Sequence, residues 1–349
     1  MLILKINSIF AHQNKTTIGF NRVKDNRTRQ HPVELLAGHF FYNMNQLPRS
    51  IDEHIKYLQQ KGMTFPDKEA ATDLFSRVSY SRLKYYWRDL IEVDSDGVFK
   101  VGTTFSTIIG RYAFDHQLRV ILFDAIETIE VALRAKIIDH MSKAAGNGLW
   151  YLDSNLFEDK QRHQDFVLDL KYEFERSTEP FAKKYISEHP DWDCNSLSGD
   201  NPDAWLIIEV ATFGTLSKMY KNLKSQLPQR SAVANDFGLY SSKDFSNWIE
   251  VISLMRNIVA HHSRLWNRSL GKKIIDPKGK RNAWLNGELT EIQKKKPYAV
   301  ICAIAYLCKA VNYQHGFSNA VKHICSVYPD IPLARYGFPV RWEKEPLWR

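Results

Sequence analysis

The sequence is dominated by one long stretch in which apolar residues recur at helical spacing. It covers residues 111–141, and its apolar positions lie mostly three or four residues apart. They are Phe114, Leu118, Ile121, Leu122, Ala125, Ile129, Ala132 and Leu133. At about 3.6 residues per turn, this spacing places them on one side of a helix. Because alternating, strand-like patterns are almost absent from the chain, we predict an all-α protein.

Shorter helices are predicted on both sides of this stretch. Ser50 and Glu53 have the spacing of a capping box, and an apolar face follows them. The other predicted helices cover residues 68–75, 165–176, 203–224, 243–268 and 297–327, with a short one at 181–186. Residues 94–97 form a turn that is expected to join a small strand pair, and residues 179–202 read as a loop.

Composition narrows the class of protein. The 349 residues, 44% of them hydrophobic, indicate a globular chain with one large domain or two small ones. The net charge of +9 favours an anionic partner. The apolar run in residues 1–5 is shorter than a signal peptide is expected to have, and no stretch approaches the about 20 apolar residues of a membrane span. We therefore predict a soluble cytoplasmic protein, with its four cysteines as free thiols and residues 1–30 as a polar, basic extension.

The segment from 256 to 268 carries the strongest chemical signal, with the sequence RNIVAHHSRLWNR. Continued as a helix, it places one group of polar residues on a single strip without any acid. The members of this strip are Arg256, Asn257, His261, Arg264 and Arg268. His262 falls on the apolar side with Leu265 and Trp266, so it is predicted to be a core or wall histidine.

This strip suits chemistry on a phosphate backbone. A guanidinium can hold a phosphate bidentately, and an imidazole titrates near neutrality and can transfer protons. Asn257 lies one turn before His261 and could orient its ring. A solvated basic face with an incidental histidine remains an alternative, because an arginine five residues before a histidine also occurs at Arg49 and Arg111.

The chain continues as a basic region after this segment. Between residues 256 and 281 the only acid is Asp276, and the cations include Lys272 and Lys273. We predict a local basic field beside the candidate site.

Several motifs together resemble a known family. RNIVAHHSRLWNR contains the pattern RNxxxH, which resembles the active-site signature of the HEPN superfamily of ribonucleases. The longer string resembles bacterial abortive-infection (Abi) proteins of the AbiD/AbiF kind, and the signature is also similar to that of type VI CRISPR effector nucleases. Further matches run in order along the chain: VSYSRLKYYW at 78–87, YAFDHQLR at 112–119, DAIETIEVALR at 124–134, AW at 204–205, FGTLS at 213–217 with Tyr220, GFPVRW at 337–342 and PLW at 346–348. His116 departs from the pattern, which would place a basic residue there.

The resemblance implies a fold and its boundaries. It implies a HEPN-type helical bundle with additional N-terminal and C-terminal helices. The Abi-type all-helical domain would cover residues 31–349, its HEPN core about 105–270, and its C-terminal helix and tail 290–349.

The resemblance also implies an activity. HEPN ribonucleases cut RNA without a metal or cofactor, by attack of the 2′-hydroxyl, and leave a 2′,3′-cyclic phosphate. In this chain Arg256 and His261 would be catalytic, with Asn257 in support. RNA would be bound by Arg264, Arg268, Lys272, Lys273 and Arg82. The resemblance implies a homodimer with a composite active site and a toxin of a phage-defence system. Its restraint would come from a cognate noncoding RNA or a protein partner.

Other functions stay open from the sequence. The main alternative is a non-catalytic HEPN module that binds RNA or acts as a sensor, and a third class is a DNA-binding repressor. Glu127, Glu130 and Arg134 share one helix face, where they either line the site or form an intrahelical ion-pair ladder, the interpretation that we favour. The aromatic cluster at 80–87 could stack on bases, but packing is the commoner fate of such residues. A zinc site lacks ligand spacing.

Overall fold

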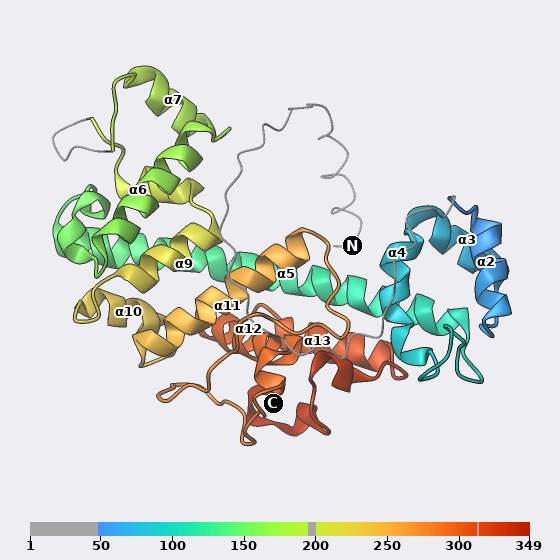
Figure 1. Ribbon diagram of the computed structural model, residues 1–349. Coiled ribbons are helices and arrows are strands. Elements are labelled where there is room, and N and C mark those ends of the chain that lie inside the picture. The colour runs from blue at the N-terminus through green and yellow to red at the C-terminus, as the bar shows by residue number, and fades with distance from the viewer. Residues whose placement is uncertain (1–47, 195–199, 313) are drawn as a thin grey trace. The chain divides into compact units, whose positions relative to one another are not determined.

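In the described part of the chain, helices are the only extended regular secondary structure (Figure 1). The computed structural model describes residues 48–194, 200–312 and 314–349, and residues 49–349 form one compact unit. These described residues form twelve α-helices and several short 3₁₀ helices joined by turns and loops, and no strand or sheet occurs among them. The all-α prediction is therefore confirmed, while the predicted extension at residues 1–30 lies outside the described residues.

The longest element is α5, Phe105–Ala145, with 41 residues. It begins at Thr104, whose side chain accepts a hydrogen bond from the Thr107 N–H, and ends at Gly146, which adopts a left-handed conformation with φ of 66°. The predicted helix at 111–141 lies within it. Its apolar face is buried along the whole length, so α5 forms the axis of the fold.

Most of the other predicted helices are present. Ser50 and Glu53 form the expected capping box at the start of α2. The remaining helices are α2 (Ile51–Gln60), α3 (Lys68–Arg77), α4 (Tyr80–Leu83), α6 (Lys160–Glu175), α7 (Pro180–Glu188), α8 (Ala204–Ile207), α9 (Phe213–Asn222), α10 (Pro228–Asp236), α11 (Ser242–Ala260), α12 (Pro297–Val311) and α13 (Phe317–Val327).

Three predictions of secondary structure were wrong in detail. The predicted helix at 297–327 is two helices, separated before Gly316, which has a φ of 73°. α10 was not predicted. The expected strand pair is a single bridge between Ile91 and Phe99.

The predicted helix at 203–224 is also broken, before α9. Side chains from other helices satisfy the backbone at this break. Arg134 of α5 donates to the carbonyls of Ile208 and Ala211 at 3.1 and 2.9 Å, and a carboxylate oxygen of Glu173 accepts the Thr212 N–H at 3.0 Å. These bonds replace the local bonds of a continuous helix, so the break is set by tertiary contacts that periodicity does not encode.

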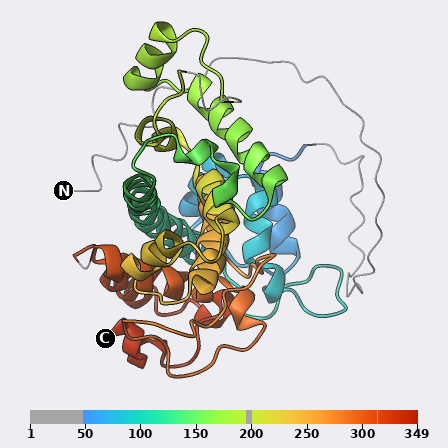
Figure 2. The same ribbon diagram turned by 90° about the vertical axis from the view of Figure 1, so that its left-hand side faces the viewer.

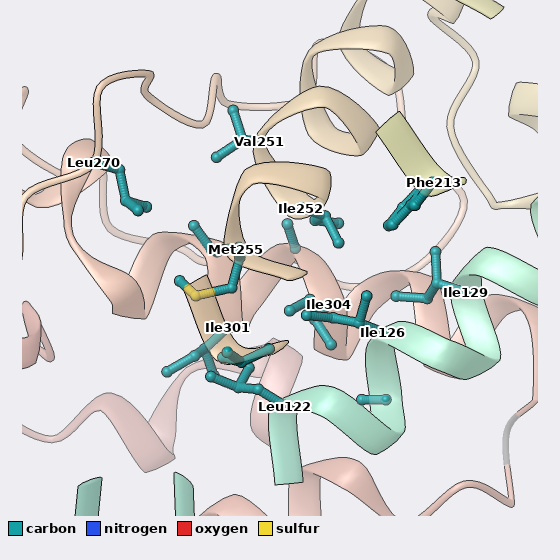
Figure 3. Close-up of a cluster of buried hydrophobic side chains, with 14 of the residues drawn as sticks. Leu122, Ile126, Ile129, Phe213, Val251, Ile252, Met255, Leu270, Ile301 and Ile304 are labelled. Carbon is teal, nitrogen blue, oxygen red and sulfur yellow. The ribbon is translucent and has the colours of Figure 1, made fainter. Parts of the chain in front are cut away.

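The core lies where α9, α11 and α12 pack on α5 (Figure 2). Figure 3 shows buried side chains from these helices meeting in one cluster: Leu122, Ile126, Ile129, Phe213, Val251, Ile252, Met255, Ile301 and Ile304. Fully burying one such side chain contributes about 1.5–3 kcal/mol. Because Met255 and Ile252 point into this cluster, the rotation of α11 about its axis is fixed.

The four cysteines are free, as predicted, with Cys194, Cys302 and Cys308 buried. Among the described residues, no helix is both long enough and apolar enough to cross a membrane.

Candidate active site at the end of α11

The candidate site lies where α11 stops. The His262 N–H donates to the Val259 carbonyl at 3.0 Å, and the Ser263 N–H donates to the Ile258 carbonyl at 2.9 Å. This pair of bonds is a Schellman motif, which closes a helix by placing one residue in the left-handed region. That residue is His262, with a φ of 55°, at a position where glycine is usual. The helix therefore ends immediately before His261.

The predicted helix at 243–268 is consequently wrong in its last part, and so is the single polar strip. Arg264 and Arg268 lie in the loop that follows α11, not on its face. His262 is exposed instead of buried in the core, because the left-handed turn redirects the chain there. Leu265 and Trp266 are buried, as predicted.

A buried carboxylate, Asp115 of α5, holds this loop. It is fully buried, and its two oxygens accept hydrogen bonds from groups on four segments. The donors are the Leu265 N–H (3.0 Å), the Trp266 N–H (2.7 Å), the Tyr86 hydroxyl (2.8 Å), the Tyr336 hydroxyl (3.0 Å) and the Arg119 guanidinium. Burial and the Asp115 charge raise the pKa of both tyrosines well above the usual range, so their hydroxyls stay protonated donors.

Arg82 of α4 supports the same loop from the other side. Its side chain is half-buried and donates to the carbonyl of His262. A cation hydrogen-bonded beyond the last turn also complements the negative end of the helix dipole. The structure thus gives Arg82, predicted to bind RNA, a positioning contact with the backbone of the site.

Arg256, the predicted phosphate-binding residue, faces α5. Its Nε lies 3.7 Å from Oε2 of Glu130, beyond hydrogen-bonding distance, and its side chain is 35% exposed. Glu130 also pairs with Arg134 at 3.4 Å. The idea of a strip without acids nearby is therefore wrong, because Glu130 reaches it from another helix. The prediction of an intrahelical ion-pair ladder is confirmed only in part, because Glu130 pairs with Arg256 of α11 as well as with Arg134.

The environment of Glu130 is electrostatically unusual. Burial raises the pKa of Glu130 above its ordinary value, although Arg256 and Arg134 both lower it. Within the described residues Glu130 is the carboxylate that lies within ion-pair distance of Arg256. A phosphate could therefore reach Arg256 by displacing a long and weak contact.

The two other predicted catalytic residues are open to solvent. Asn257 and His261 are both exposed, and within the described residues neither side chain makes a hydrogen bond. The Asn257 side chain, which could orient the His261 ring, makes no hydrogen bond to it in this structure, although the Asn257 backbone carbonyl accepts the His261 N–H at 3.0 Å. Both side chains are thus available to a ligand.

The predicted RNA-binding residues fall into two groups. Arg264 and Arg268 stay near the site, with the Arg264 guanidinium 4.7 Å from the centre of the Tyr85 ring and the Arg268 Nε donating to the Arg264 carbonyl at 2.6 Å. Tyr85 is 40% exposed, whereas Tyr86 and Trp87 of the same cluster are buried, as the packing interpretation predicts.

Lys272 and Lys273 form the other group, and each is paired with a carboxylate. Lys272 bonds to Glu250, and the Lys273 Nζ lies 2.6 Å from a carboxylate oxygen of Glu291. They line an open cavity of about 620 Å³. The basic field read from residues 256–281 is therefore partly neutralised by acids from outside that range.

His116, the departure from the family pattern, lies beside the site. It follows Asp115 on α5 and is exposed. Partial burial lowers the pKa of His116, and the charges of Arg119, His262 and Arg82 lower it further. The histidine therefore shares an electropositive region with the end of α11. Among the described residues, no three His, Cys, Asp or Glu side chains come together as they would around a metal ion.

A family model covers most of the residues of the candidate site. The model of the Abi-like protein family matches residues 73–267, which is more than half of the chain and ends just after Trp266. The chain belongs to the Abi-like protein family. Comparisons with curated proteins and with solved structures give no match. Membership of the Abi-like family supports, in general terms, a role in abortive-infection defence.

The sequence alone did not single out Asp115, which lies within the matched region. Asp115 lies inside the YAFDHQLR string, and its position four residues before Arg119 among apolar residues is the one local signal of a buried ion pair. Its partners Tyr86 and Tyr336 lie far away in the sequence. Asp115 and its donors Tyr86, Leu265 and Trp266 belong to three of the motifs that carry the resemblance to Abi proteins, so these motifs meet at one carboxylate, while Tyr336 lies outside them.

Proposed function

We propose that this Abi-like protein is a metal-independent endoribonuclease, a HEPN-type toxin of a phage-defence system. The observation that carries the proposal is the end of α11. It leaves the side chains of His261 and Asn257 exposed with no hydrogen bond to the described protein, and Arg256 partly exposed with a contact of 3.7 Å to Glu130, on a backbone fixed by Asp115 and Arg82. Catalytic side chains commonly make their hydrogen bonds only once substrate is bound.

The reaction would be an internal transfer within RNA. The ribose 2′-oxygen bonds to the adjacent phosphorus and loses its proton to a base, and the bond from phosphorus to the 5′-oxygen breaks. That oxygen takes a proton from an acid. The products are a 2′,3′-cyclic phosphate and a 5′-hydroxyl. His261 would act as the base or the acid, Arg256 would hold the phosphate, and Asn257 would position the ring or a phosphate oxygen.

The second proton transfer suggests a second copy of the chain. One histidine serves one end of the reaction, so a homodimer with two facing sites would supply both. The exposed face of α5 supports this arrangement, because Val120, Phe123 and Val131 are 44%, 46% and 52% exposed there. Phe123 lies seven residues before Glu130, on nearly the same side of α5 as the contact to Arg256. Cleavage of RNA by a strictly monomeric protein would contradict the dimer.

A cellular nuclease of this kind must be restrained before infection. The partner would be a cognate noncoding RNA or a protein, and the partly exposed cations Arg264 and Arg268 favour an RNA.

The deciding experiment is RNA cleavage in EDTA, with analysis of the product ends. The wild type should leave 2′,3′-cyclic phosphates, and His261→Ala should fold normally and lose at least about 10²-fold in rate. His323→Ala, which removes an exposed histidine of α13, is the matched control and should cleave normally. Tight RNA binding without cleavage would instead assign the chain to the non-catalytic modules.

A further inference from the structure

Four cations from three segments gather beside the loop that follows α11. Arg264 and Arg268 come from the loop itself, Lys296 caps the start of α12, and Arg335 lies on the 3₁₀ turn Leu333–Tyr336. Arg335 has a carboxylate partner, Asp89, at 3.1 Å. We call the other three, Arg264, Arg268 and Lys296, the loop cations.

The loop cations form no ion pair with any described residue. In the described part of the chain, no carboxylate lies within 4 Å of any of the three, and Asp89 is already shared between Arg335 and Arg111. Burial lowers the pKa of Arg268 and the charge of Arg264 lowers it further, while the more distant charge of Asp115 raises it. Burial also lowers the pKa of Lys296, with the charges of Arg335 and Arg264 adding to the effect. Like charges are thus held close together in a partly desolvated place.

The loop cations are nevertheless held in place. The Arg264 guanidinium lies over the Tyr85 ring and donates to the Trp266 carbonyl. The Lys296 Nζ lies 3.4 Å from Oδ1 of Asn267.

The stem of Lys296 is packed as well. It lies so close to Gly337 that a Cβ on that residue would come within 2.4 Å of the Lys296 Cβ. Neutral groups and aromatic packing therefore order the cluster, and its positive charge remains available to an external anion.

We propose that Arg264, Arg268 and Lys296 form a phosphate-binding subsite that anchors an RNA strand beside His261. The inference rests on the proposed function, because it assumes that the strand continues to that histidine. Arg264 is three residues after His261, so their Cα atoms are at most about 11 Å apart. Guanidinium groups bind phosphate oxygens bidentately, and lysine adds a point charge. A partly exposed ring, Tyr85, next to these cations fits a nucleic acid better than an acidic peptide.

The test distinguishes a binding role from a structural one, because removal of a charge should raise the stability of the free protein and lower its affinity for RNA. Lys296→Met keeps the packed stem but removes the charge, so the free protein should unfold at a higher urea concentration than the parent. RNA binding should weaken at the same time. Single-stranded RNA would be titrated by fluorescence anisotropy in a His261→Ala background at several salt concentrations. The slope of log K against log salt should fall by about 0.7 for one lost phosphate contact.

A control variant on the same helix and a second substitution in the cluster complete the test. Lys309→Met removes an exposed lysine from the same helix, α12, and should leave the slope unchanged. Arg268→Gln should repeat the fall in the salt slope, although it also removes the hydrogen bond from the Arg268 Nε to the Arg264 carbonyl. Inorganic phosphate should raise the melting temperature of the parent more than that of either variant. An unchanged slope in both variants, or binding of a polyglutamate peptide in place of RNA, would overturn the subsite. A wild type that binds RNA with this salt dependence but does not cut it would refute the nuclease and leave the subsite intact.

Discussion

Replacing Asp115 should be among the most damaging single changes in this protein. Asp115→Ala would leave Arg119 as a buried charge without a partner, which costs about 3–5 kcal/mol. It would also leave the buried N–H groups of Leu265 and Trp266 unsatisfied, at about 1–3 kcal/mol each. Since a whole domain is stable by about 5–15 kcal/mol, the variant should be close to unfolding.

A double-mutant cycle makes this reasoning quantitative. Tyr336→Phe alone removes one hydrogen bond to a buried charge and should cost about 1.5–3 kcal/mol. In an Asp115→Asn background, where the charge is gone, the same change should cost much less. Urea unfolding followed by tryptophan fluorescence gives the four free energies, and hydrogen exchange should show that the Leu265 and Trp266 amides lose protection. Additive costs, or an Asp115→Ala variant within about 1 kcal/mol of wild type, would refute the role of Asp115 as the support of the loop.

Two further predictions concern the end of α11 and its acidic neighbour. His262→Gly should stabilise the protein by up to about 1 kcal/mol in urea melts, because the left-handed conformation disfavours a side chain, whereas His262→Ala should be nearly neutral; a destabilised glycine variant would show that the imidazole itself contributes to the fold. Glu130→Gln should gain stability relative to wild type as the pH rises from 4 to 7. The folded protein holds the Glu130 proton more tightly than the unfolded chain, so wild type loses stability as that proton leaves. A relative stability that falls with pH would mean that attraction to Arg256 and Arg134 outweighs burial.

The features of the fold that depend on residues close together in the sequence were predicted correctly. The capping box at Ser50 and the apolar period of α5 depend on residues three or four apart, and both are present. Both members of the proposed catalytic pair, Arg256 and His261, belong to the last turn of α11 or its cap, where the pattern is still helical.

Non-local contacts explain where prediction from the sequence failed. Neither glycine nor proline marks the end of α11, and the apolar period continues through Leu265 and Trp266. The helix stops because their N–H groups bond to Asp115, about 150 residues earlier in the chain. The pairing of Arg256 with Glu130 is equally distant in sequence. A helical wheel describes one helix alone and therefore predicts neither contact.

The early end of α11 also changes what the site can bind. A helix continued to residue 268 would have placed Arg264 and Arg268 in line with Arg256, as one straight row of charge. The Asp115 hydrogen bonds instead turn the chain, and His261 lies in the sequence between the end of α11 that carries Arg256 and the loop that carries Arg264 and Arg268. An RNA strand bound both at Arg256 and at the loop cations would pass the His261 imidazole. A straight row of cations along one helix face would not require this path. A variant that weakens the hydrogen bonds of Asp115 without unfolding the protein should therefore lose cleavage rate more than RNA affinity. Arg256 and the loop cations remain, but the distance between them is no longer fixed.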